Sequence, residues 1–116
     1  MVNRSDVYLA DLTPRSGSEQ TGRRPVVVIS NNGFNQTLNW KSLIVIPVSS
    51  SGSQAQRGLT AVLLPKGSGG LTKDSVALCH QITTVDRSKL LQFFGHLSDK
   101  IIKELEEGIK AAIDIE

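Results

Sequence analysis

Residues 17–30 read Gly17-Ser18-Glu19-Gln20-Thr21-Gly22-Arg23-Arg24-Pro25-Val26-Val27-Val28-Ile29-Ser30. Glycine accepts backbone angles that other residues avoid, so a glycine at each end of the polar part favours a sharply turning loop. Pro25 favours an extended conformation at Arg24, and the β-branched run that follows predicts a buried strand. Arg24 therefore lies where a loop meets a sheet, a position from which its guanidinium can bind a phosphate or a carboxylate.

Strand-like segments with turn signals between them recur along the chain. We expect strands at Asp6–Ala10, Pro25–Ser30, Ser42–Val48, Thr60–Leu64, Ser75–Cys79 and Gln81–Val85, with a further short strand at Leu90–Phe94. The one clear helix begins near Ser98, a good N-cap residue. Its apolar side chains share one face at helical spacing: Leu97, Ile101, Leu105, Ile109, Ala112 and Ile113. The pattern predicts a mainly β fold, a small curved antiparallel sheet or barrel with the C-terminal helix packed across it.

Length and composition predict one globular domain over residues 1–116, because 116 residues with 39% apolar side chains support a single core. No apolar run approaches the ~20 residues of a membrane span, and the first residues do not resemble a signal peptide, so we expect no membrane association. Cys79 is the only cysteine, which excludes an internal disulfide and fits a cytoplasmic protein. Its apolar neighbours predict a packed thiol rather than a reactive one.

Charge is distributed unevenly along the chain. Residues 98–116 carry six acids and three bases, a net charge of −3, whereas the rest carries ten bases and five acids, a net charge of +5. A basic body with an acidic tail suits a body that binds a polyanion.

Several motifs follow one another in a fixed order through almost the whole chain: Met1-Val2-x-Arg4-x-Asp6-Val7-Tyr8, Asp11-Leu12-x-Pro14, Gly17-Ser18-Glu19-Gln20, Gly22-x-Arg24-Pro25, Ile46-Pro47-Val48-Ser49, Asp74-Ser75-Val76-Ala77-Leu78 and Gln81-Ile82. In this order they resemble the MazF/PemK toxins of bacterial toxin–antitoxin systems. The resemblance implies an SH3-like barrel with a C-terminal helix, as in MazF and CcdB, and a homodimer. It also implies a ribosome-independent endoribonuclease that cleaves single-stranded mRNA at specific sequences and is neutralised by a cognate MazE-like antitoxin.

The resemblance also implies catalytic residues. RNA can be cut without a metal or cofactor, because its 2′-OH can attack the neighbouring phosphate to leave a 2′,3′-cyclic phosphate and a 5′-OH. In the family the arginine at the place of Arg24 is catalytic, and a hydroxyl residue after the third strand is its partner. Ser49 occupies that place, with Ser50 one residue away as the alternative register. Glu19 is the candidate base, or else the partner of Arg24 in a structural ion pair.

Neighbouring loops supply the other candidates. We expect RNA contacts from Ser18, Gln20, Arg23, Ser50, Arg57 and Gln81. Trp40 stacks on a base or packs at a dimer interface or in the core, and the role of His80 is open. His96 is most simply a capping or packing residue. An acidic, disordered segment of the antitoxin is expected along the same basic groove.

Other functional classes fit less well. The segment Gly67-Ser68-Gly69-Gly70 has neither Walker A nor dinucleotide-fingerprint spacing, and no Gly-x-Ser-x-Gly elbow occurs. One cysteine and two histidines cannot form a standard four-ligand zinc site, so we expect no metal. The alternative from another class is a CcdB-like toxin that binds DNA gyrase, which would need a C-terminal Trp-Gly-Ile where this chain has Asp114-Ile115-Glu116. A plain SH3-like binding module would need more than 4% aromatic residues to line its groove.

Overall fold

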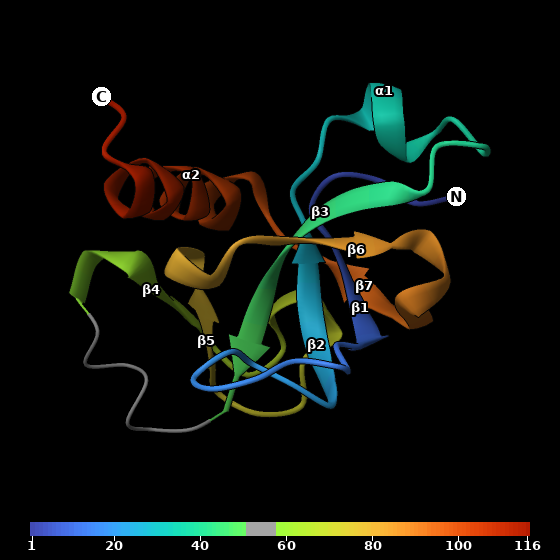
Figure 1. Ribbon diagram of the computed structural model, residues 1–116. Helices are drawn as coiled ribbons and strands as arrows, with labels where there is room; N and C mark the ends of the chain where they lie inside the picture. Colours follow the sequence, from blue (N-terminus) through green and yellow to red (C-terminus); the bar gives the residue numbers. More distant parts are fainter. Residues whose placement is uncertain (51–57) are drawn as a thin grey trace.

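The computed structural model describes residues 1–50 and 58–116 (Figure 1). In these residues the strands are β1 (Asp6–Asp11), β2 (Arg23–Val28), β3 (Ser42–Ser49), β4 (Ala61–Leu64), β5 (Ser75–Leu78), β6 (Thr83–Asp86) and β7 (Leu90–His96). The α-helices are α1 (Asn32–Asn35) and α2 (Asp99–Ile113). Short 3-10 turns complete the elements: η2 (Gly58–Thr60), η3 (Ser68–Gly70), η4 (Cys79–Gln81) and η5 (Arg87–Lys89).

All the expected strands form, with ends that differ by at most two residues. β6 starts at Thr83 instead of Gln81, because residues Cys79–Gln81 turn as η4 between β5 and β6. β2 begins earlier than expected, since Arg23 and Arg24 already pair with β1. The sequence also did not predict α1, a single turn that Asn31 caps by accepting a hydrogen bond from the Gly33 amide at 2.7 Å.

The strands form one strongly bent antiparallel sheet in the order β4-β5-β3-β2-β1-β7, and β6 also pairs with β3. β3 causes the bend because it changes neighbours along its length. Val45 to Pro47 pair with β2, whereas Val48 and Ser49 pair with β5. Within the described residues β4 and β7 do not pair with each other, so the sheet is an open form of the predicted barrel. The expected mainly β fold with a C-terminal helix is confirmed.

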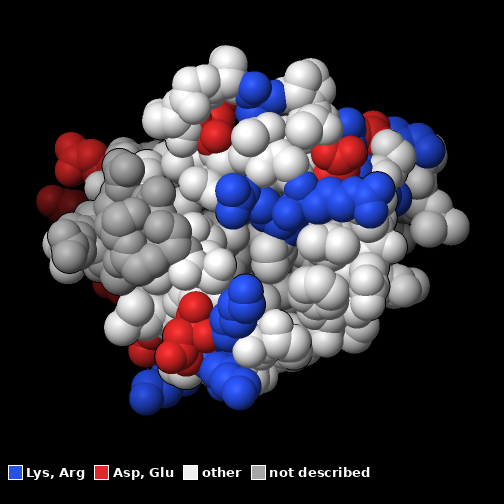
Figure 2. All heavy atoms as spheres, turned by 90° about the horizontal axis from the view of Figure 1, so that it is seen from below, with Lys and Arg blue, Asp and Glu red and all other residues white. Residues whose placement is uncertain are grey.

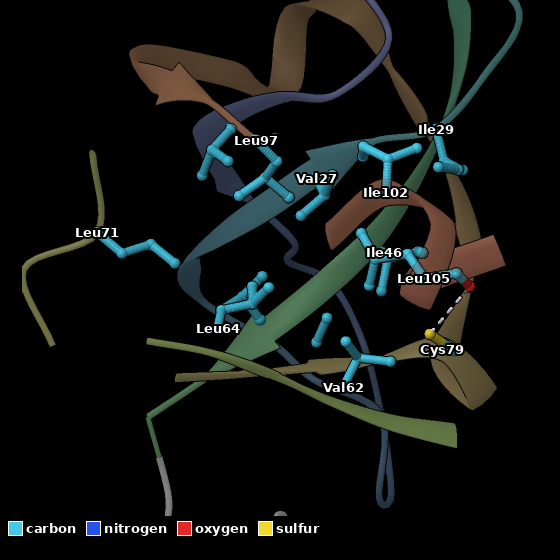
Figure 3. Close-up of a cluster of buried hydrophobic side chains, with 13 residues drawn as sticks. Val27, Ile29, Ile46, Val62, Leu64, Leu71, Cys79, Leu97, Ile102 and Leu105 are labelled. Atoms are coloured by element: carbon cyan, nitrogen blue, oxygen red, sulfur yellow. Dashed lines mark hydrogen bonds between the residues drawn. The ribbon is translucent and has the colours of Figure 1, made fainter. Parts of the chain in front are cut away.

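Helix α2 packs across the sheet over the larger hydrophobic cluster (Figure 3). Leu105 lies beside Ile46, and the Cys79 thiol donates to the Leu105 carbonyl oxygen at 3.7 Å. A Cβ on Gly108 would meet the Cys79 sulfur at 2.7 Å, so the helix approaches η4 more closely than any larger residue would allow. Burial raises the pKa of the Cys79 thiol to about 11, which confirms a packed, unreactive cysteine.

The helix begins where the sequence predicted, and Leu97, Ile101, Leu105 and Ile109 of the expected apolar face pack on the core cluster. Ser98 is the N-cap, and its Oγ accepts a hydrogen bond from the Ile101 amide at 3.3 Å. The buried helical residues are Ile102, Leu105 and Gly108. Ile113, which we expected on the packed face, is 53% exposed because the last turn of the helix carries no buried residue. No helix in the described part of the chain is long and apolar enough to cross a membrane.

The glycine-rich segment before β5 is a structural clamp. η3 lies against β7, and a Cβ on Gly70 would stand 2.1 Å from the Phe94 carbonyl oxygen. Gly70 also has φ +78°, in the left-handed region that favours glycine. At the far end of this loop an Asp74 carboxylate oxygen accepts the Lys66 amide at 2.8 Å. These contacts fix residues 66–74 against the sheet edge, beside the start of β2.

Candidate functional site

The loop between β1 and β2 folds back over the end of β6. The Leu12 amide donates to the Gly22 carbonyl oxygen at 2.9 Å, which closes the base of the loop. Arg15 then crosses to β6, where its Nη1 donates to Thr83 Oγ1 at 3.1 Å. The same Nη1 lies 3.6 Å from Glu19 Oε2, so Glu19 pairs with Arg15 and not with Arg24 as the simpler interpretation of the sequence proposed.

Gln81 joins this loop to η4. Its side-chain oxygen accepts the Gln20 amide at 2.7 Å, and its side-chain nitrogen donates to the Ser18 carbonyl oxygen at 3.2 Å. The side-chain amide of Gln81 therefore holds the loop backbone in place. Beside it lies a hollow of about 320 Å³, here called the loop hollow, lined by Leu12, Arg15, Ser18, Glu19, Gln20, Pro47, His80, Gln81, Ile82 and Thr83. In this part of the described structure Gln20 Oε1 is buried without a hydrogen-bond partner.

Arg24 lies on the other side of the loop, opposite Ala10 of β1. Its Nε donates to the Thr21 carbonyl oxygen at 2.9 Å, which fixes the plane of the guanidinium. Among residues 1–50 and 58–116 no carboxylate lies within ion-pair distance of Arg24. A guanidinium oriented by its own loop and not neutralised by an acid is suited to bind an anion.

A second hollow, here called the arginine hollow, opens next to Arg24 because β3 leaves β2 after Pro47. Its volume is about 540 Å³. Its basic residues are Arg23, Arg24 and Lys73; its other lining residues are Leu9, Pro25, Val48, Ser50, Gly70, Leu71, Thr72, Ser75, Gln92 and Phe94. None of these described residues is acidic, so the rim attracts a phosphate while the floor is apolar.

Consecutive residues of β3 line the two hollows, with Pro47 in the loop hollow and Val48 in the arginine hollow. Figure 2 shows this end of the molecule from below, with a band of basic side chains across it and smaller acidic groups beside the band. The uneven charge expected from the sequence is therefore visible on the end that carries the β1–β2 loop. An extended polyanion could cross from one hollow to the other along this surface.

The structure separates the two candidate serines. Ser49 is the last residue of β3 and pairs with Val76 of β5, with 3% of its surface exposed. The β2–β3 register places Val26 opposite Pro47, and two further residues along it would bring Ser49 level with Arg24. Ser50 is exposed and lines the arginine hollow. Arg57, another predicted contact, lies outside the described residues.

Other singled-out residues lie away from both hollows. Trp40 stacks on Phe34 with ring centroids 4.7 Å apart, and it is half-exposed on the loop before β3 rather than buried in the core. Arg87 holds this loop by donating to the carbonyl oxygens of Phe34, Thr37 and Trp40. His96 does not cap α2; its Nδ1 lies 3.1 Å from the buried carboxylate of Asp6.

Sequence reasoning missed Lys73 and Gln92. Both line the arginine hollow, yet they belong to the loop before β5 and to β7, far along the chain from Arg24. No motif marks either residue, because only the packing of η3 on β7 brings their segments to the start of β2. A basic residue just after a glycine-rich turn was the sole local signal.

The fold and these hollows define a small, bent-sheet protein with a basic, hollowed end. Residues 3–113 match the family described as PemK-like, MazF-like toxin of type II toxin-antitoxin system, and the chain belongs to this family. The resemblance noted in the sequence is thereby confirmed.

Individual relatives agree with this assignment. The chain is 37% identical over 115 residues to Endoribonuclease MazF of Staphylococcus saprophyticus, covering 99% of this chain and 93% of the relative. The fold is similar to that of MazF (Form-I) from Deinococcus radiodurans, with a TM-score of 0.81, 23% identity and coverage of 98% and 97% of the two chains. MazE-MazF (Form-II) from the same organism gives a TM-score of 0.75 at 22% identity, covering 99% and 97%.

Proposed function

We propose that the chain is an endoribonuclease toxin that cleaves single-stranded mRNA at specific sequences without the ribosome. The position of Arg24 carries this proposal: it is oriented by Thr21, unpaired with any described carboxylate, and set in a hollow with two further cations. Membership of the toxin family and the name of the 37% identical relative support the same activity.

The proposed reaction needs no metal. The 2′-oxygen of one nucleotide attacks the next phosphorus, the bond to the 5′-oxygen breaks, and the products are a 2′,3′-cyclic phosphate and a 5′-OH. Arg24 binds the non-bridging oxygens, whose negative charge grows in the transition state. The Ser49 hydroxyl, or that of Ser50, donates a hydrogen bond that orients the phosphate. Contacts with the bases come from the loop hollow, where Ser18, Gln20 and Gln81 lie.

Glu19 is our candidate for the base that accepts the 2′-OH proton. It lines the loop hollow, whereas Arg24 lines the arginine hollow, so catalysis by both would require them to reach one phosphodiester across the end of β3. Its ion pair with Arg15 supports the other role, that of holding the loop in shape. The two roles differ in what they require of the carboxylate, since only catalysis needs it to take up a proton.

We further propose a cytoplasmic homodimer that is neutralised by a cognate antitoxin. A dimer would place two basic ends side by side and lengthen the surface available to RNA, and two-fold symmetry is the usual form of such an assembly. The similarity of the fold to that of MazE-MazF (Form-II) from Deinococcus radiodurans supports an antitoxin partner for this chain. Its binding segment would be acidic and disordered and would lie along the hollows.

The test is to incubate purified protein with a natural mRNA in EDTA and to sequence both ends of every fragment. We expect cuts at one short sequence, with cyclic phosphate and 5′-OH ends. An all-deoxy strand carrying the same sequence should stay intact, because it lacks the attacking 2′-OH. Cleavage of the deoxy strand at those sites, or cleavage only with added divalent metal, would contradict the proposed chemistry.

A further inference from the structure

Lys73 is the one basic residue of the arginine hollow that does not come from the start of β2. It is exposed, and it belongs to the loop before β5, whereas Arg23 and Arg24 belong to β2. Within residues 1–50 and 58–116 Lys73 takes part in no ion pair. The fold therefore holds a lysine at this rim without giving it a structural partner there.

The backbone beneath Lys73 is held firmly. Gly70 and Gly95 let η3 touch β7, where any Cβ would collide with backbone atoms. The Leu71 carbonyl oxygen accepts the Gly67 amide at 2.8 Å, and Ser75 Oγ donates to the carbonyl oxygen of Lys73 itself at 3.0 Å. The backbone of a lysine on such a segment stays in place, and only its flexible side chain moves to contact a ligand.

The neighbouring acid does not neutralise it. Asp74 directs Oδ1 to the Lys66 amide, which keeps its charge on the loop side of the segment. No acidic residue of the described chain lines the hollow, so Lys73 and the two arginines produce a field of one sign around an apolar floor. A chain of phosphates joined by flat, partly apolar nucleosides is the ligand that matches this arrangement.

We propose that Lys73 binds a second phosphate of the RNA strand, next to the one that Arg24 holds at the cut. This inference rests on the proposed function, because it takes RNA as the occupant of the hollow. The nucleoside between the two phosphates lies against the floor formed by Pro25, Leu71 and Phe94, with the Gln92 amide at its edge. Because Lys73 contacts phosphate and not a base, it raises affinity without choosing sequence.

Lys66 provides a matched control. It lies in the same loop, carries the same charge and is also exposed, but it does not line the arginine hollow. Lys73→Gln and Lys66→Gln therefore remove the same charge from the same segment, and they differ in the contact proposed here. Thermal unfolding of both variants checks that the loop stays folded.

The first measurement is binding of a single-stranded, 2′-fluoro oligonucleotide of mixed sequence, which lacks the attacking hydroxyl. Log Kd is followed against log salt concentration by fluorescence anisotropy. Each phosphate contact on a single strand contributes a slope of about 0.7, so Lys73→Gln should lower the slope by about that amount. Lys66→Gln should leave the slope unchanged, and Lys73→Arg should restore it. Equal slopes for Lys73→Gln and Lys66→Gln would overturn the proposal.

The second measurement is cleavage of ribose RNA, which separates this inference from the proposed function. Lys73→Gln should raise KM several-fold and leave kcat close to that of the unmodified protein, because the lysine holds a phosphate that does not react. If the protein cleaves RNA and Lys73→Gln matches Lys66→Gln in KM and slope, the lysine contact is wrong and the nuclease stands. If RNA is bound with a Lys73-dependent slope but never cut, the contact stands and the nuclease is wrong. Absence of any RNA binding overturns both.

Discussion

Arg24 is held in position by a residue of its own loop. Its Nε is engaged by the Thr21 carbonyl oxygen at 2.9 Å, so the terminal nitrogens of the guanidinium are held at a fixed angle on the rim of the arginine hollow. The neighbouring Pro25 has no amide hydrogen, and β3 leaves β2 close to it. The hydrogen bond to Thr21 therefore orients the arginine, and the separation of β3 from β2 near Pro25 opens the space beside it.

We expect Arg24→Ala to reduce the rate of RNA cleavage by roughly 10²–10³-fold, the usual loss when one group that stabilises transition-state charge is removed. Arg24 is partly exposed and makes no described ion pair, so the midpoint of thermal unfolding should not change. Arg24→Lys should recover only part of the activity, because lysine keeps the charge without the two-pronged geometry. Full activity in Arg24→Ala would remove Arg24 from the mechanism.

Ser49 and Ser50 can be distinguished by parallel alanine variants. Ser49 would be level with Arg24 if the β2–β3 register continued two residues past Pro47, so Ser49→Ala should slow cleavage about tenfold, the value of one hydrogen bond to a charged group. Ser50→Ala should leave the rate within about twofold of the unmodified protein. Single-turnover rates on one RNA give the comparison. The reverse ranking would assign the hydroxyl to Ser50, which lines the arginine hollow.

At the level of elements, the site depends on the contact between η3 and β7. Gly70 has φ +78°, and a Cβ there would meet the Phe94 carbonyl oxygen at 2.1 Å. Gly67 also has a positive φ, at +95°, but a Cβ there would meet no atom within 4 Å. A substitution at Gly67 therefore introduces backbone strain alone, whereas a substitution at Gly70 introduces both backbone strain and a steric collision.

Gly67→Ala should lower the free energy of unfolding by about 1–2 kcal/mol, the cost of a left-handed conformation for a residue with a Cβ. Gly70→Ala should cost roughly 1–3 kcal/mol more, because the loop must also move off β7. Urea titration of both variants gives these values. Equal losses would show that η3 does not pack tightly on β7, and the placement of Lys73 would lose its support.

At the scale of the whole molecule, the basic end that we propose as the RNA site is also exposed to an inhibitor. An acidic antitoxin segment in the two hollows would place carboxylates where phosphates bind, and its apolar side chains would cover the floor of the arginine hollow. The acidic outer side of α2, with Glu104 and Glu107, is the opposite kind of surface and would repel such a segment.

We therefore expect the antitoxin segment and RNA to exclude each other, with an affinity that falls as salt rises from 50 to 500 mM because the exposed charges are increasingly screened, the Debye length being ~10 Å at 0.1 M. Competition in fluorescence anisotropy, using the slow variant Ser49→Ala to preserve the RNA, measures this directly. Simultaneous binding of both ligands without mutual effect would place the antitoxin on a remote surface. Tighter binding at high salt would likewise contradict an electrostatic groove.

The sequence by itself determined the elements and the family. β-branched runs between turn residues gave each strand to within two residues, and Ser98 fixed the start of α2, because these signals act over a few neighbouring residues. The loop-to-strand junction at Arg24 was predicted from signals that were equally local. The order of short motifs along the chain was sufficient to recognise a MazF-like toxin.

The tertiary structure alone decided which side chains meet. It paired Glu19 with Arg15 instead of Arg24, left Ile113 exposed, and brought Lys73 and Gln92 to the same hollow as Arg24. These outcomes depend on the bend in β3, on the direction in which α2 crosses the sheet, and on the contact between η3 and β7 that Gly70 and Gly95 allow. Such contacts join residues far apart in the chain, so their free energies come from the packing of the whole sheet and not from any local sequence pattern.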